Sequence, residues 1–229
     1  MRVGILHSGG KDSTYAAYLA KQRDQIMCLI TVQPLREGSY MFHHPAISWT
    51  KLQAEAIGLP QVLVKTEGVK EEELSDLRRA FELARDGYSI EGVYTGALAS
   101  VYQKSRVERI CSELGLDCIS PLWLIEPETH LRNLVKNRFL AIITAVAALG
   151  LDESWLGRVI DDEAIQELVL LQKKYGLHIG LEGGEGETFV LDCPLFKKKI
   201  EVLSTERHWL GDRGHLEIRE AKLVEKNLH

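Results

Sequence analysis

The chain has 229 residues, of which 45% are hydrophobic and 27% are charged. This length allows a substantial buried core, in one large domain or in two unequal ones. Acidic residues outnumber basic residues by 33 to 28, giving a formal net charge of -5. Because proteins that follow nucleic-acid phosphates usually carry a cationic excess, this balance disfavours RNA as the main substrate.

The cysteines and the apolar segments bear on the cellular compartment. None of the four cysteines forms a C-x-x-C pair, so neither a zinc site nor a disulfide framework is predicted. The longest apolar run, residues 139–151, is shorter than the roughly 20 residues that span a bilayer, and it is predicted to contain a buried strand. The first residues already resemble a strand, which leaves no room for a signal peptide. We therefore expect a cytoplasmic protein without membrane segments.

Strand-like and helix-like segments alternate through the first half of the chain. Strands are expected at residues 3–6, 26–32, 61–64 and 92–94, and helices at 13–22, 46–57, 71–85 and 100–114. Pro45 suits a helix start, and Gly58, Gly87 and Gly115 suit helix ends. This alternation predicts an α/β fold with a doubly wound parallel sheet.

The pattern changes after Trp123. Helices are expected at residues 128–136 and 162–175, and strands at 187–191 and 200–207. Gly211-Asp212-Arg213-Gly214 lies between two strand-like runs and is typical of a hairpin turn. We therefore expect two domains, residues 1–123 and a smaller α+β portion of residues 124–229.

A glycine-rich motif lies between the first expected strand and the first expected helix. At such a position, backbone N–H groups and the positive helix end favour phosphate binding. Glycines permit a close backbone approach, the lysine adds a point charge, serine hydroxyls add donors, and the aspartate suits a helix cap or magnesium. The expected nucleotide-binding residues are Ser8, Gly9, Gly10, Lys11, Asp12 and Ser13, with Asp12 as the candidate metal ligand.

The motif is not a Walker A loop, because Ile5 replaces the leading glycine and Asp12 replaces the serine or threonine after the lysine. Its S-G-G-x-D-S pattern resembles the PP-loop of the ATP pyrophosphatases, which cleave ATP to AMP and pyrophosphate. That resemblance implies a HUP-like sheet, with ATP and magnesium as cofactors.

Two further blocks resemble the diphthine–ammonia ligase family. One runs from Gly180 to Phe196 and contains Glu182, Glu185, Glu187 and Thr188; the other contains Gly96, Tyr102, Arg106 and Glu108. Gly96 follows the fourth expected strand, at the sheet edge where open α/β sheets bind ligands. Three carboxylates on a glycine-rich turn would repel a bare triphosphate, so a cation must be near them if they serve the site.

The family resemblance implies amidation of diphthine on translation elongation factor 2, using ATP and ammonia through an acyl-adenylate. The chain resembles the compact archaeal members, and because its sequence carries no glutaminase signature, free ammonia is the expected nitrogen source. The expected catalytic residues are Lys11, Arg106 and Glu185, and Gly96 joins the nucleotide-binding set. The expected substrate-binding residues are Tyr102, Glu108, Glu182, Glu185, Glu187 and Thr188, whose carboxylates and aromatic ring suit the trimethylammonium group of diphthine.

Two alternatives stay open at the level of sequence. One is a PP-loop enzyme that adenylates a tRNA base, and the other is an ATP-sensing module with slow turnover. The acidic balance and the missing catalytic cysteine pair count against the first, and the carboxylate-rich block counts against the second. His43 and His44 suit a loop or substrate pocket better than a metal site. The oligomeric state is undetermined, and a homo-oligomer is compatible with the sequence.

Overall fold

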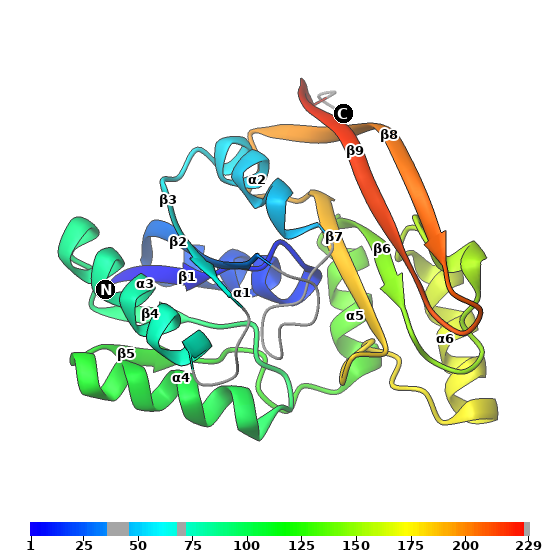
Figure 1. Cartoon of the computed structure of the whole chain (residues 1–229), viewed down its shortest axis with the longest axis horizontal. Coiled ribbons are helices and arrows are strands. Elements are labelled where there is room, and N and C mark those ends of the chain that lie inside the picture. Colours follow the sequence, from blue (N-terminus) through cyan, green and yellow to red (C-terminus); the bar gives the residue numbers. More distant parts are fainter. Residues whose placement is uncertain (36–45, 68–71, 227–229) are drawn as a thin grey trace. The chain divides into compact units, whose positions relative to one another are not determined.

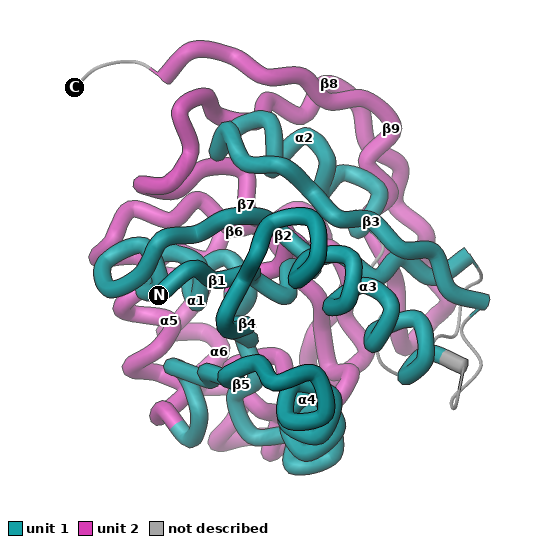
Figure 2. The backbone as a smooth tube through the Cα atoms, turned by 90° about the vertical axis from the view of Figure 1, so that its left-hand side faces the viewer, with its two compact units in different colours: residues 1–8, 12–124 teal, residues 9–11, 125–229 magenta. Residues whose placement is uncertain are grey.

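The computed structural model describes residues 1–35, 46–67 and 72–226. The chain divides into two compact units, one formed by residues 1–8 and 12–124 and the other by residues 9–11 and 125–229 (Figure 2). The sequence places the whole glycine-rich motif in the first domain. The structure differs, because residues 9–11 group with the second unit.

The first unit is an α/β layer structure around a five-stranded parallel sheet. The strands have the order β3-β2-β1-β4-β5 (Figure 1). The order reverses at β1, and ligands of such sheets bind at the carboxyl edge beside this reversal. Its elements are β1 (Arg2–Leu6), α1 (Lys11–Lys21), β2 (Gln25–Pro34), η1 (Ile47–Trp49), α2 (Thr50–Ile57), β3 (Gln61–Thr66), α3 (Glu72–Tyr88), β4 (Gly92–Tyr94), α4 (Val101–Leu114) and β5 (Asp117–Ile119).

The core of this unit follows from the near-continuous apolar runs of its central strands β1, β2 and β4, which are largely buried. Ile30 of β2 and Val93 of β4 are fully buried, as are Leu77 and Phe81 of α3. Helices α3 and α4 pack together over these strands. The predicted α/β class with a parallel sheet is therefore confirmed.

The observed helix ends can be compared with the glycines that the sequence predicts at those positions. Gly58 and Gly115 adopt the left-handed conformation, with φ of 79° and 68°, and end α2 and α4 as predicted. Gly87 lies inside α3, so the prediction that it ends that helix is wrong. The chain leaves the helix only at Ser89, which has φ of 51°. Pro45 lies outside the described residues, and the short strand β5 was not predicted.

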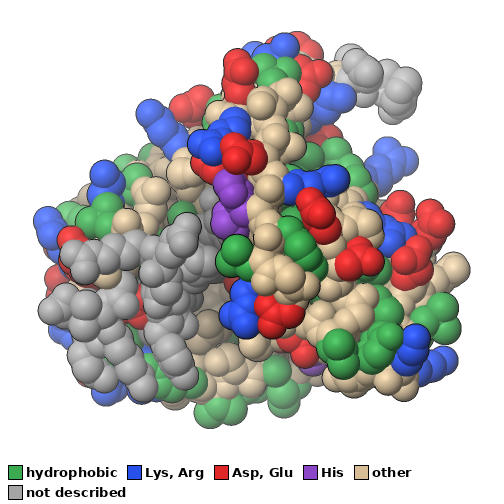
Figure 3. All heavy atoms as spheres, turned by 45° about the vertical axis from the view of Figure 1, so that its right-hand side comes forward, with side chains coloured by type: hydrophobic (Ala, Val, Ile, Leu, Met, Phe, Trp, Pro, Cys, Tyr) green, Lys and Arg blue, Asp and Glu red, His purple; other side chains and the backbone are tan. Residues whose placement is uncertain are grey.

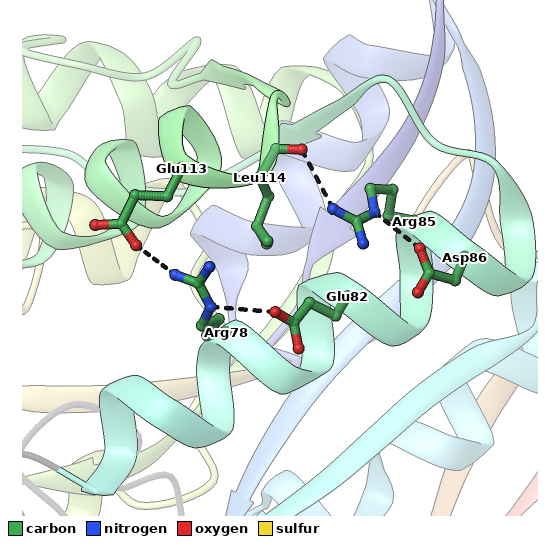
Figure 4. A network of polar contacts seen from close by, with 6 residues as sticks. All are labelled: Arg78, Glu82, Arg85, Asp86, Glu113 and Leu114. Atoms are coloured by element: carbon green, nitrogen blue, oxygen red, sulfur yellow. Dashed lines mark hydrogen bonds and ion pairs between the residues drawn. The ribbon is translucent and has the colours of Figure 1, made fainter.

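Surface ion pairs connect α3 and α4 (Figure 4). Arg78 of α3 pairs with Glu82 on its own helix and with Glu113 of α4. Arg85 donates to the carbonyl oxygen of Leu114, near the end of α4, at 3.5 Å. The side chains of these ion pairs are 40–47% exposed, and such surface pairs contribute only about 0–1 kcal/mol each. The buried apolar contacts therefore hold the two helices in place.

The second unit contains an antiparallel sheet of order β7-β6-β9-β8 and two helices that contact each other. The predicted smaller α+β portion is confirmed. Strands β8 and β9 pair over nearly their whole length, but β9 meets β6 only near Gly214 and His215. The elements are α5 (Pro127–Lys136), β6 (Leu140–Val146), η2 (Glu153–Trp155), α6 (Asp162–Tyr175), β7 (Gly186–Asp192), β8 (Lys198–Trp209) and β9 (Gly214–Glu225).

Both long helices of this unit begin and end at residues with clear local reasons. Asp161 accepts from the backbone N–H of Ala164 at 2.8 Å and caps α6, and Gly176 ends it with φ of 76°. Glu126 caps α5 in the same way, followed by Pro127 in the first turn. These signals explain why both helices were predictable within one residue. No helix among the described residues is long and apolar enough to cross a membrane.

Candidate active site

The glycine-rich motif forms the turn from β1 into α1. In the first unit, the backbone N–H of Ser8 donates to the Oγ of Ser13 at 3.2 Å, and the two hydroxyl oxygens are also 3.2 Å apart. Gly9 has φ of 85°, a conformation that side-chain-bearing residues rarely adopt. The turn thus places the N-terminal end of α1 at the carboxyl end of the central strand, where backbone N–H groups favour an anion.

Gly96 follows β4 and passes directly against the start of α1. A methyl group at this position would lie 2.6 Å from the backbone nitrogen of Ser13 and 2.7 Å from the carbonyl carbon of Asp12. Both are backbone atoms, which cannot turn aside as a side chain can. The predicted nucleotide-binding residues Gly96, Asp12 and Ser13 are therefore brought together, and glycine is required by this close approach.

His7, the last residue before the motif, is a supporting residue that the sequence analysis missed. Its side chain is 1% exposed, and its Nε2 lies 3.3 Å from the Oγ1 of Thr14 in α1. Its Nδ1 has no hydrogen-bond partner within the described part of the chain. Burial lowers the pKa of His7 from 6.5 to about 4, so the ring is neutral at physiological pH.

We expect His7 to make folding stability depend on pH between 6.5 and 4, the unfolded and folded values of its pKa. Below pH 6.5, His7 takes up a proton in the unfolded chain but stays neutral in the folded protein. The contribution of neutral His7 to the free energy of unfolding is therefore fully present above pH 6.5 and is lost as the pH falls toward 4. The contribution lost is about 3 kcal/mol. Urea unfolding of wild type and His7→Gln at several pH values would measure it. Parallel stability curves for the two proteins would contradict the prediction.

In the second unit, the middle of the motif is bound to strand β7. The backbone N–H of Val190 donates to the carbonyl oxygen of Gly9 at 3.0 Å, and the backbone N–H of Lys11 donates to the Oγ1 of Thr188 at 3.0 Å. The Nζ of Lys11 lies 3.9 Å from a carboxylate oxygen of Glu182. Lys11 is only 2% exposed. The structure thus brings together Lys11, Glu182 and Thr188. The sequence predicted nucleotide binding for Lys11 and substrate binding for Glu182 and Thr188.

The acidic turn before β7, residues 181–185, has a left-handed backbone conformation at three positions and a hydrogen bond from its own segment. Leu181, Gly183 and Gly184 have positive φ values of 58°, 69° and 86°. The carboxylate of Glu185 accepts from the backbone N–H of His178 at 2.5 Å. Glu187 is the second residue of β7 and pairs with Ala145 of β6. Of the three predicted carboxylates, Glu182 lies beside the glycine-rich motif and Glu185 stabilises the turn.

The predicted residues of α4 lie in two surroundings. The Arg106 guanidinium stacks 3.3 Å above the centre of the Tyr102 ring and donates to the Tyr102 carbonyl oxygen at 3.3 Å. The Nε of Arg106 is buried and has no hydrogen-bond partner within the described residues. Glu108 is exposed and pairs with Lys104 one turn away. Arg106 and Tyr102 therefore form one unit, whereas Glu108 makes an ordinary surface ion pair.

Within the described residues, one group of three side chains has the composition of a metal site. The candidate ligand atoms of Glu206, His208 and Glu217 lie within 4.8 Å of one another on the β8–β9 hairpin. Arg219 contacts the carboxylates of Glu206 at 2.6 Å and Glu217 at 2.9 Å. Because this arginine supplies the positive charge, we interpret the group as an ion-pair network. His43 and His44 lie outside the described residues.

The charged side chains bear on the kind of partner. On the face shown in Figure 3, acidic and basic side chains are interspersed among hydrophobic ones, and no large basic area is seen among the coloured residues. Proteins that bind nucleic acids along the phosphate backbone usually concentrate lysine and arginine on one face.

The parallel sheet and the phosphate-type loop at its point of strand reversal define an α/β nucleotide-binding protein of the PP-loop type. Family models described as the N-terminal and C-terminal domains of diphthamide synthase match residues 1–118 and 126–224. The human protein named diphthine–ammonia ligase is 39% identical, with 90% of this chain and 84% of the human protein covered. The chain belongs to the diphthine–ammonia ligase family.

Other relatives differ in length. The protein of the same name from Schizosaccharomyces pombe is 34% identical, with 96% of this chain but only 39% of that protein covered.

A solved structure described as a predicted tRNA methyltransferase subunit from Methanocaldococcus jannaschii covers 85% of this chain, with a TM-score of 0.46 and 20% identity. That likeness carries no information on function.

Proposed function

We propose that this protein is an ATP-dependent ligase that converts the carboxylate of diphthine, carried by translation elongation factor 2, into the amide of diphthamide. The observation that supports this most strongly is family membership across both halves of the chain. Ammonia is the proposed nitrogen donor, and AMP and pyrophosphate are the proposed by-products. A cytoplasmic location is part of the proposal.

The chemistry requires two substitutions. A carboxylate resists attack by ammonia, so its oxygen first attacks the α-phosphorus of ATP and pyrophosphate leaves with the electrons of the broken P–O bond. Ammonia then attacks the carbonyl carbon of the acyl-adenylate, AMP leaves with the former carboxylate oxygen, and the nitrogen loses a proton. Activation by a good leaving group makes the second substitution feasible without a covalent enzyme intermediate.

The proposed role of the glycine-rich motif is to stabilise charge on the departing pyrophosphate. Backbone N–H groups at the start of α1 and the Lys11 ammonium offer preorganised donors, and such donors lower the barrier when charge develops beside them. Arg106 is proposed to add a second cation, because its buried Nε has no hydrogen-bond partner among the described residues. These roles are supported by position and residue chemistry.

Magnesium is proposed to accompany ATP. Magnesium is usually held in proteins by one or two carboxylates together with phosphate oxygens and water. Asp12, in the first turn of α1, offers such a carboxylate within the phosphate-binding motif. The donor set therefore fits the ion, which would polarise the phosphates when bound.

Recognition of diphthine is proposed to use carboxylates and an aromatic face, because its trimethylammonium group is a cation. Glu185, Glu187 and Tyr102 remain candidates for this role. Arg106 covers one face of the Tyr102 ring, so substrate binding on that face requires the guanidinium to move.

The proposal is tested by incubating this protein with diphthine-bearing elongation factor 2, magnesium ATP and heavy-nitrogen ammonium chloride. We expect mass spectrometry to show replacement of the diphthine hydroxyl by a labelled amino group, with one AMP for each amide. AMP release without amidation would contradict the proposed substrate. Release stimulated by tRNA would favour a tRNA-modifying enzyme, and slow AMP formation with every substrate would favour an ATP sensor.

A further inference from the structure

Strand β7 forms two hydrogen bonds with the glycine-rich motif. Thr188 and Val190 are two residues apart on the strand, and they bind Lys11 and Gly9, which are also two residues apart. Among the described residues, β7 is an edge strand whose one strand partner is β6, so its other edge is available to the motif. Both hydrogen bonds are 3.0 Å long. The two hydrogen bonds hold the backbone of Gly9 and Lys11 against this edge of β7.

The Thr188 hydroxyl performs the function of a helix cap. The first backbone N–H groups of a helix have no acceptor within the helix, and a serine, threonine, aspartate or asparagine just before it usually supplies one. Gly10 precedes α1 and has no side chain to offer. The acceptor for Lys11 comes instead from Thr188, which is 177 residues away in sequence and 6% exposed.

The side chain of Lys11 is held by the same segment as its backbone. Its ammonium lies 3.9 Å from Glu182, whose side chain is 28% exposed, whereas the lysine side chain is 3% exposed. A phosphate group that enters the motif must attract this ammonium in competition with Glu182. The segment of residues 182–190 thus contacts both the backbone N–H and the ammonium group of Lys11.

We propose that Thr188 is a positioning residue that caps α1 and fixes the phosphate loop, and that Glu182 is the resting counter-ion of Lys11, replaced by phosphate when the nucleotide binds. This role differs from diphthine binding, which the sequence predicted for both residues. The inference depends on the proposed function only in assuming that the loop binds the phosphates of ATP. The inference gives Glu182, the first glutamate of the turn before β7, a role in nucleotide binding.

The first test compares Thr188→Val with Thr188→Ser. Binding of α,β-methylene ATP, which cannot be cleaved at the α-phosphate, is measured by calorimetry. We expect Thr188→Val to bind roughly fivefold to tenfold more weakly, because the cap is lost, and Thr188→Ser to stay within about twofold of wild type. In steady state, Thr188→Val should raise the KM for ATP and lower kcat while leaving the KM for ammonia unchanged.

Thr144→Val is the matched control. Thr144 lies on β6 in the same sheet, is 1% exposed, and its Oγ1 has no hydrogen-bond partner among the described residues. The same change of side chain there should leave nucleotide affinity unchanged. Circular dichroism of the variants identifies any loss of folding, and Thr188→Ala, which also lacks the hydroxyl, replaces Thr188→Val in the test if the valine variant does not fold. Equal affinity of wild type and a folded Thr188→Val would overturn the proposed cap.

The second test addresses Glu182. Because a carboxylate competes with phosphate for Lys11, Glu182→Gln should bind the ATP analogue more tightly than wild type in EDTA, by roughly threefold or more. Weaker or unchanged binding under these conditions would overturn the counter-ion role. If wild type itself does not bind the analogue with or without magnesium, the proposed function fails. Binding by wild type with no effect of either substitution would refute only the positioning inference.

Discussion

Replacing Gly96 with alanine is expected to reduce AMP formation by about 100-fold, because small displacements of catalytic geometry have effects of this order. The new methyl group would lie 2.6–2.9 Å from backbone atoms of Asp12 and Ser13. The first turn of α1 must therefore move, and the phosphate-binding N–H groups move with it. The strain should also lower the free energy of unfolding by about 1–3 kcal/mol. Steady-state AMP assays and urea unfolding would measure both effects.

Gly87→Ala is the matched control for Gly96→Ala. Gly87 lies inside α3, and no atom lies within 4 Å of the position that a methyl group would occupy. Alanine there should stabilise the protein by about 0.5–1 kcal/mol through its higher helix propensity, with activity unchanged. A Gly96→Ala protein as active and as stable as Gly87→Ala would show that the close approach to α1 has no functional importance.

Replacing Lys11 with alanine is expected to reduce the rate of pyrophosphate release by about 100- to 1,000-fold, the usual effect of removing one preorganised donor to developing negative charge. Lys11 is the buried cation of the phosphate motif and the first residue of α1. Its backbone N–H, which donates to Thr188, is kept in the variant. The loss should therefore appear in kcat more than in stability, and single-turnover release of pyrophosphate would measure it.

Lys21→Ala controls for the loss of a positive charge from the same helix. Lys21 is exposed in the last turn of α1, at the end opposite to the motif. Its removal should leave the rate within about twofold of wild type, because exposed charges at this distance are screened. A Lys11→Ala protein with the activity of Lys21→Ala would exclude Lys11 from the chemistry and would move the proposed phosphate site elsewhere.

Gly87 and β5 differ from what local sequence patterns predict, and each has a physical reason. A glycine near the end of a helical pattern is compatible with either a helix end or one more turn, and the side-chain packing of α3 decides between them. Strand β5 has only three residues, Asp117–Ile119, and is stabilised by pairing with β4 rather than by its own pattern. Short elements of this kind depend on contacts that are distant in sequence.

The sequence by itself determined the alternation of strands and helices, the ends of α2, α4 and α6, and the phosphate-type motif after β1, because these follow from local periodicity, capping and backbone freedom. Tertiary structure alone decided that residues 9–11 group with the second unit, that Thr188 caps α1, and that Glu182 rather than Glu185 faces Lys11. Thr188 and Lys11 are 177 residues apart. Such contacts depend on how strand β7 pairs and which edge it exposes, and a local sequence pattern carries no information about either.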